Sequence, residues 1–202
     1  MAIHVIDAAI QMIATEVNNY LLISPGNEIV IPSNLLTQSG SLVQGLDGHI
    51  VMSLVNIEED RISRPLNVHR KLSNGTVETI KPEVRLNLYF LFTAVPASTN
   101  VDTTGATYVN SVRNLSRVIG FFQTKNFFDI QNTPSLEGQL GRIWMELYPL
   151  TFEQQNHLWG AMGAKYMPSI MYKVRIVTIQ ENEVQFDGPP ITQVNLNGQA
   201  SS

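Results

Sequence analysis

The sequence contains no cysteine, and this absence removes several kinds of chemistry at once. Without cysteine the chain forms no disulfide bond, offers no thiolate to a metal and has no cysteine nucleophile. It also lacks an apolar run of the roughly 20 residues that cross a bilayer, and no basic stretch of a signal peptide opens it. We therefore expect neither a disulfide framework nor a membrane partner.

The motifs that identify the common classes of enzyme are also missing. No Walker A loop, G-x-S-x-G elbow, H-E-x-x-H or C-x-x-C occurs. The glycine pair Gly160 and Gly163 is too short for a phosphate loop and lies at the end of a predicted helix, where the dipole disfavours anions. No two histidines stand at metal-ligand spacing; the four are His4, His49, His69 and His157. The sequence thus predicts no catalytic residue, no metal and no cofactor.

Basic residues are absent from both ends of the chain. The net charge is −4, which argues against nucleic acid as a partner. Residues 1–60 and 181–202 contain acidic residues but neither lysine nor arginine, so residues 61–180 hold all 13 basic residues. Either the opposite charges meet within the fold, or the acidic and basic faces of neighbouring subunits meet.

Two segments have the apolar periodicity of amphipathic helices. Residues 3–22 repeat apolar side chains every three or four positions, and Asn18 stands off this stripe. Residues 104–122 show the same period, with Arg113 and Arg117 one turn apart on one face. Both segments are predicted to pack one face against a sheet.

A third helix is predicted over residues 151–163 from its two ends. Thr151 and Gln154 form a capping-box pattern at its start. Gly163 suits the left-handed residue that ends a helix, and Pro168 prevents the helix from resuming.

Six further segments have strand patterns, and the alternation is clearest in the third of them. They are residues 28–31, 49–58, 84–92, 126–130, 140–150 and 170–179. Residues 60–81 read as an irregular polar excursion with an Asn-Gly turn signal. The order α-β-β-β-α-β-β-α-β predicts an α+β fold with helices on a mixed or antiparallel sheet. Residues 1–180 form the predicted domain, and 181–202 a polar C-terminal arm, extended or disordered.

The stretch from Leu150 to Arg175 has the composition of a contact site. Trp159 and Tyr166 are amphipathic aromatics of the kind enriched in contact surfaces, and Lys165 and Arg175 supply charges for a rim. Four small residues would let another backbone approach: Gly160, Ala161, Gly163 and Ala164. We interpret the stretch as a joint between packed elements or between subunits.

Two polar groups allow a chemical alternative. His157 would need a nucleophile within reach to act as a general base, but Lys165 and Tyr166 lie beyond the helix end, so bonding to backbone or to a neighbour is favoured. The acidic run 58–60, followed by Arg61, would bind a divalent cation or form a solvated corner or interface patch; we favour the second.

Four segments resemble the cap, or tail-terminator, proteins of contractile injection systems, of the extracellular antifeeding-prophage-like type. They are VMSLVNIEEDR (51–61), LNLYFLFTA (86–94), LSRVIGFFQ (115–123) and LTFEQQNHLWGAMGAKYMPSIMYKVRIVTI (150–179). The resemblance covers residues 3–180 and implies a phage tail-terminator-like α+β fold. It further implies a non-enzymatic hexameric ring that closes the inner tube and contractile sheath distal to the baseplate. Such a protein would assemble in the bacterial cytoplasm as part of a particle released from the cell.

The same resemblance implies how a cap would bind. Sheath subunits exchange strands, so the last layer exposes unpaired edges, which a cap could finish by β-augmentation with its arm or with strands near 84–94 and 170–179. We expect the contacts with sheath, tube and neighbouring copies to involve charged and aromatic residues from several elements. They are Glu58, Glu59, Arg61, Arg113, Arg117, Trp159, Lys165, Tyr166 and Arg175.

Two other functions stay open at this point. The chain could be an adaptor that recruits cargo or an ATPase to such a particle through residues 60–81 or 181–202. It could also be a small hydrolase or metal-dependent enzyme that uses His157 with Glu146 or Glu153.

Overall fold

The computed structural model describes residues 5–21, 28–60, 68–71, 77–80, 84–97, 105–134, 136, 141–179 and 184–188. Three helices and nine strands are described, and their bounds in chain order are α1 (Val5–Tyr20), β1 (Val30–Pro32), β2 (Ile50–Glu59), β3 (Val68–Lys71), β4 (Val77–Ile80), β5 (Val84–Ala94), α2 (Ala106–Thr124), β6 (Phe127–Phe128), β7 (Arg142–Leu147), α3 (Phe152–Met162), β8 (Ser169–Ile179) and β9 (Val184–Gly188).

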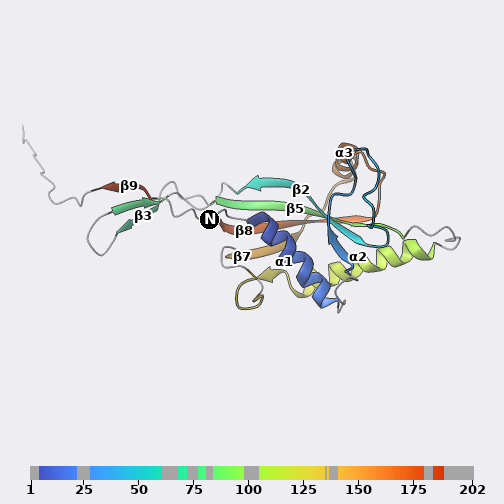
Figure 1. Cartoon of the computed structure of the whole chain (residues 1–202), viewed down its shortest axis with the longest axis horizontal. Coiled ribbons are helices and arrows are strands. Elements are labelled where there is room, and N and C mark those ends of the chain that lie inside the picture. The colour runs from blue at the N-terminus through green and yellow to red at the C-terminus, as the bar shows by residue number, and fades with distance from the viewer. Residues whose placement is uncertain are drawn as a thin grey trace, which may run out of the picture.

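Six strands form the main sheet in the order β1-β2-β5-β8-β7-β6 (Figure 1). Neighbouring strands are antiparallel except β1 and β2, which are parallel. The two longest strands, β5 and β8, lie in the middle and pair with neighbours on both sides. The hypothesis that strands near 84–94 and 170–179 offer an edge to a partner is therefore wrong, because their edges are already used within the sheet.

Helices α1 and α2 cover one face of this sheet (Figure 1). The alternation predicted for 84–92 is what builds this core, since Leu88, Phe90 and Phe92 are all fully buried beneath the helices. From α1 the apolar stripe contributes Ile13 and Val17, which are equally buried. Burial of these large side chains is the main stabilising term of the fold.

Within the described residues, the opposite face, which we call the second face, is covered only at one end. There α3 and the loop before β2 enclose a second apolar cluster, in which Trp159 packs with Val51, Leu91 and Met171. The start of β2 is thus buried on both faces, as the continuous apolar run predicted. Further along the strands this face has no helix above it within the described residues.

A smaller sheet has the order β3-β4-β9 and lies beyond one end of the main sheet (Figure 1). Each of its strands is antiparallel to its neighbour. The order β3-β4-β9 follows the order of β2, β5 and β8 in the main sheet. Along the chain β3 follows β2, β4 precedes β5 and β9 follows β8. Each strand of the smaller sheet is therefore the chain neighbour of the main-sheet strand at the same place in the order β2-β5-β8.

The fold class predicted from the sequence is confirmed: helices pack on a mostly antiparallel sheet in an α+β arrangement. All three predicted helices are present. The reading of residues 60–81 as irregular is wrong where β3 and β4 form, although Lys71 opposite Val77 agrees with a hairpin whose tip, 72–76, lies outside the described residues. Five residues of the predicted arm form β9; the division into a domain and an arm stays a prediction.

Candidate functional site

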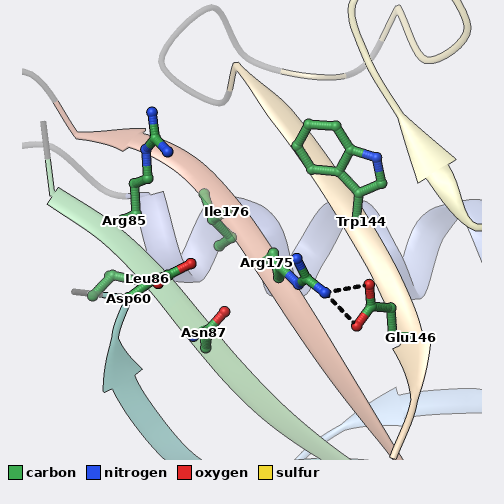
Figure 2. Close-up of a pocket in the computed structure, with 8 residues that line it drawn as sticks. All are labelled: Asp60, Arg85, Leu86, Asn87, Trp144, Glu146, Arg175 and Ile176. Carbon is green, nitrogen blue, oxygen red and sulfur yellow. Dashed lines mark hydrogen bonds and ion pairs between the residues drawn. The ribbon is translucent and has the colours of Figure 1, made fainter. Parts of the chain in front are cut away.

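The uncovered part of the second face carries polar and aromatic side chains from β5, β8 and β7. These strands form a hollow of about 310 Å³ (Figure 2). Its lining consists of Asp60, Arg85, Leu86, Asn87, Trp144, Glu146, Arg175 and Ile176. Alternate positions of the predicted strands already placed several of these residues on the face opposite the core, so period two was the signal that could have found them.

An ion pair crosses this hollow between β8 and β7. One nitrogen of Arg175, Nη2, donates to both carboxylate oxygens of Glu146, at 2.6 and 2.8 Å (Figure 2). The hydrogen bond and charge of Glu146 raise the pKa of Arg175. Both side chains are 48% exposed, so water screens the pair and its net contribution is about 0–1 kcal/mol.

Asn87 lies between two residues that the sequence singled out. In the register it stands opposite Glu58 on one side and Arg175 on the other. The side chain is only 6% exposed, and its Oδ1 has no hydrogen-bond partner. Within the described residues this is one of four buried side-chain polar atoms left without a partner.

Tyr89 links Glu58 to the aromatic part of the face. Its hydroxyl donates to Glu58 Oε2 at 2.8 Å, while Asn56 Nδ2 donates to the other oxygen at 3.0 Å. The ring of Tyr148 lies edge-on at 5.2 Å, and Lys173 Nζ is 5.8 Å from the centre of the Tyr89 ring. Both carboxylate oxygens of Glu58 thus accept hydrogen bonds from other side chains, which disfavours Glu58 as a ligand of a divalent cation.

The two buried tyrosines predict a loss of stability at alkaline pH. Burial, and then the hydrogen bond to Glu58, raises the pKa of Tyr89 from 10.0 to about 12, and burial does the same for Tyr172. The unfolded chain therefore releases these protons first, so the stability they contribute is complete below pH 10 and is lost between about pH 10 and 12. Denaturant titrations across this range should show the decline, and Tyr89→Phe and Tyr172→Phe should each remove part of it. An unchanged slope in both variants would contradict the assignment.

The end of α3 presents a different surface. Its capping box is present as predicted: Thr151 Oγ1 accepts from Gln154 N at 3.2 Å, and Gln154 Oε1 accepts from Thr151 N at 3.0 Å. Trp159 is only 4% exposed and packs against Tyr166 at 5.6 Å, whereas Tyr166 itself is 62% exposed. Trp159 therefore supports this surface from below, and Tyr166 and the exposed Lys165 are the residues that a partner could touch.

The glycines of this segment have different roles. Gly163 ends α3 at φ 68°, a conformation that costs a residue with a Cβ about 1–2 kcal/mol. Gly160 is helical and exposed, and a Cβ there would meet no atom within 4 Å. A close approach within the chain, as predicted from the small residues, does not occur at Gly160; an approach by another subunit remains a prediction.

Alanine at these two glycines should have opposite effects. Gly163→Ala is expected to lower the free energy of unfolding by about 1–2 kcal/mol through backbone strain. Gly160→Ala should raise it by up to about 1 kcal/mol, since alanine is the better helix former. Urea titrations of the pair measure both values, and a loss of stability in Gly160→Ala would show that an unseen contact exists within the chain.

The remaining predicted contact residues are spread over other parts of the molecule. Arg113 and Arg117 lie on α2, across the sheet from the hollow; Arg113 Nη1 donates to Asn110 Oδ1 at 2.8 Å, and Arg117 Nη2 donates to Leu21 O at 3.4 Å. Glu59 ends β2, and Arg61 lies outside the described residues. The structure thus brings Glu58 and Arg175 to one face, Lys165 and Tyr166 to a second region, and the α2 pair to a third.

The positions of the described residues do not favour the hypothesis of a hydrolase or metal-dependent enzyme. Glu146, one proposed partner of His157, is engaged by Arg175. In the part of the chain that the structure describes, no group of three or more His, Asp or Glu side chains could hold a metal ion. No described helix combines the length and apolar character needed to cross a membrane.

Among the solved structures that share this fold are a sheath/tube terminator and a tube terminating cap. One is the PVC sheath/tube terminator of an extracellular contractile injection system in its extended state; the TM-score is 0.61 at 14% identity, over 100% of this chain and 66% of that one. The other is the anti-feeding prophage cap, a tube terminating cap, with a TM-score of 0.55 at 12% identity over 96% of this chain and 60% of the cap. The chain thus spans about two thirds or less of these proteins.

The family follows from the sequence as a whole. A model of the Pvc16 N-terminal domain matches residues 8–193, and the chain belongs to this family. No curated protein matches the sequence. The resemblance seen in the four sequence segments is confirmed.

Proposed function

We propose that this chain is a structural cap protein that terminates the inner tube and contractile sheath of a phage-tail-like contractile injection system. The observation that carries the proposal is the fold shared with two terminators over all or nearly all of this chain. Membership of the Pvc16 N-terminal domain family supports it independently. An adaptor role is not favoured, because both structural relatives are described as terminators.

The proposed cap is a homo-oligomeric ring, a hexamer, with sheath and tube proteins as its partners and no enzymatic role. It assembles in the bacterial cytoplasm and forms part of a particle that is released from the cell. Nucleic acid and membrane are not partners in this proposal. Head-to-tail contact around a ring needs two unlike surfaces on each copy, and the unequal distribution of charge along the chain suits that need.

Two regions of the described surface suit such contacts. The uncovered face presents Arg175 and Glu58 beside the half-buried Trp144, and the end of α3 presents Lys165 and Tyr166. Arginine and the large aromatics are the residues that most often dominate interface energetics. We therefore propose these two regions as the contact surfaces, with Arg113 and Arg117 of α2 as a third.

A combined assembly and end-binding experiment tests the function. The purified chain should form rings of about six copies, measured by mass photometry and negative-stain microscopy, and should bind the ends of sheath–tube particles assembled without a cap. Tyr166→Ala is expected to weaken end binding or ring formation while the far-ultraviolet circular dichroism stays unchanged. Failure of the wild-type chain to bind particle ends would contradict the proposal.

A further inference from the structure

The smaller sheet has two outer strands that each have one neighbour in the described part of the chain. β4 lies in the middle and pairs with both β3 and β9. The backbone groups on the far sides of β3 and β9 meet no other described strand. Unpaired edges of this kind are templates for another strand. A small sheet is stabilised when a further strand pairs with its edge.

The edge strands of the main sheet are shorter than those of the smaller sheet. β1 and β6, the outer strands, are only three and two residues long. Where β2 extends past β1, a bulge lies between Leu54 and Asn56, and the Asn56 side chain accepts from the Ile57 N–H at 2.9 Å. Short edge strands and bulges are the usual protection against unwanted pairing. The outer strands of the main sheet are thus shorter than β3 and β9, which have four and five residues. The register shift in the smaller sheet lies between Thr79 and Ile80, so β9 pairs regularly with β4 over residues 186–188.

The two edges of the smaller sheet have opposite charge in the sequence. β3 contains Arg70 and Lys71 and no acidic residue, and β9 contains Asp187 and no basic residue. Pairing of two β3 strands would place positive charge beside positive charge, and pairing of two β9 strands would place negative beside negative. Like charges across a pair are destabilising and opposite charges are favourable. The favoured pairing between copies is thus β9 with β3.

The direction of the strands follows from the register. β3 and β9 are both antiparallel to β4, so they run in the same direction. In a ring whose copies are related by rotation about an axis along the strands, β9 of one copy and β3 of the next pair in parallel. Two unlike edges make a head-to-tail contact, which gives a ring when the rotation between copies closes and does not give a twofold dimer.

We propose that β9 of each copy pairs with β3 of the next copy, so that the smaller sheets join into one continuous sheet around a ring. This inference rests on the proposed function for the existence of the ring, and adds which surface joins the copies. The occupant of each edge is a second copy of this chain.

A disulfide experiment tests the pairing directly, because the chain has no native cysteine. In one chain, positions 70 and 187 are separated by β4, so they lie about two strand spacings, or ~9.6 Å, apart. This exceeds the roughly 7 Å limit for a disulfide. The double variant Arg70→Cys/Asp187→Cys should therefore give a ladder of oligomers on a non-reducing gel after mild oxidation. Each single variant should give dimers at most, and the absence of a ladder in the double variant would count against the pairing.

Charge reversal separates this inference from the proposed function. Arg70→Glu and Asp187→Lys should each raise the concentration at which half of the protein is assembled by about tenfold, and the double variant should restore it. Asp47→Lys, which makes the same change of charge at an exposed position, is the matched control for Asp187→Lys. If both edge variants assemble like the wild type, or the double variant stays dissociated, the inference is overturned. Particle ends that still bind such a chain would leave the proposed function standing and point to a sheath strand at these edges.

Discussion

Replacing Phe92 by alanine is expected to lower the free energy of unfolding by about 3–5 kcal/mol, the usual cost of deleting a fully buried aromatic ring. Phe92 has no exposed surface. Its ring meets Phe122 of α2 at 5.5 Å and Tyr172 of β8 at 5.7 Å, so it joins the helix layer to the two central strands. Chemical denaturation followed by circular dichroism measures the loss.

Phe152→Ala is the matched control, because the same atoms are removed from a side chain that is 91% exposed. It should change the stability of the isolated chain by no more than about 0.5 kcal/mol. If Phe92→Ala cost as little as Phe152→Ala, the packing of α2 on the sheet would be wrong. Weaker ring formation in Phe152→Ala, with stability unchanged, would add the start of α3 to the contact surface.

The second large effect is expected at Asn18. This side chain is 8% exposed and joins α1 to β1 by three hydrogen bonds. Its Oδ1 accepts from the N–H groups of Ile29 and Val30, each at 3.0 Å, and its Nδ2 donates to the Val30 carbonyl at 2.9 Å. Asn18→Ala leaves these backbone groups without partners in the interior and should cost about 3 kcal/mol.

Its neighbour Asn19 provides the control, because it lies exposed on the same turn of α1. Asn19→Ala should leave the free energy of unfolding within about 0.5 kcal/mol of the wild-type value. Asn18→Asp keeps an oxygen that can accept from both N–H groups but replaces the Nδ2 donor by an oxygen facing the Val30 carbonyl, so it should also be less stable than the wild type. Equal stability of Asn18→Ala and Asn19→Ala would show that water replaces the three bonds.

Local features were predicted well because their causes lie within a few residues of sequence. The capping box joins Thr151 to Gln154 three positions later, and Gly163 ends the same helix by its own backbone freedom. The burial of Leu88, Phe90 and Phe92 follows from period two alone. None of these features needs information from a distant part of the chain.

Features that depend on distant partners were missed or misread. The sequence showed Asn18 only as a residue off the apolar stripe, because nothing nearby in sequence shows that the start of β1 places three backbone groups against it. Trp159 was predicted to lie at a joint between packed elements or between subunits, and only the tertiary structure shows that the loop before β2 and the strands beneath it enclose its ring. The edge role expected for β5 and β8 failed for the same reason, since the order of strands is a tertiary property.

For the candidate site too, the sequence showed the residues but not their arrangement. The sequence pointed to Glu58 and Arg175 as charged residues of different segments, but only the strand register places both of them beside Asn87. Likewise, it showed a basic middle and acidic ends without saying that β4 would lie between a basic and an acidic strand. The charges themselves were visible; their arrangement was not.

By itself, the sequence determined the class of fold, the ends of its helices, the inward face of its central strand and the family resemblance. These depend on short-range periodicity, on caps and on the recurrence of whole segments. The tertiary structure alone decided which strands are central and which are edges, which polar groups are buried, and which charges share a surface. Such choices are set by hydrogen bonds and packing between segments far apart along the chain, and the free energy of those contacts exists only once the segments have come together.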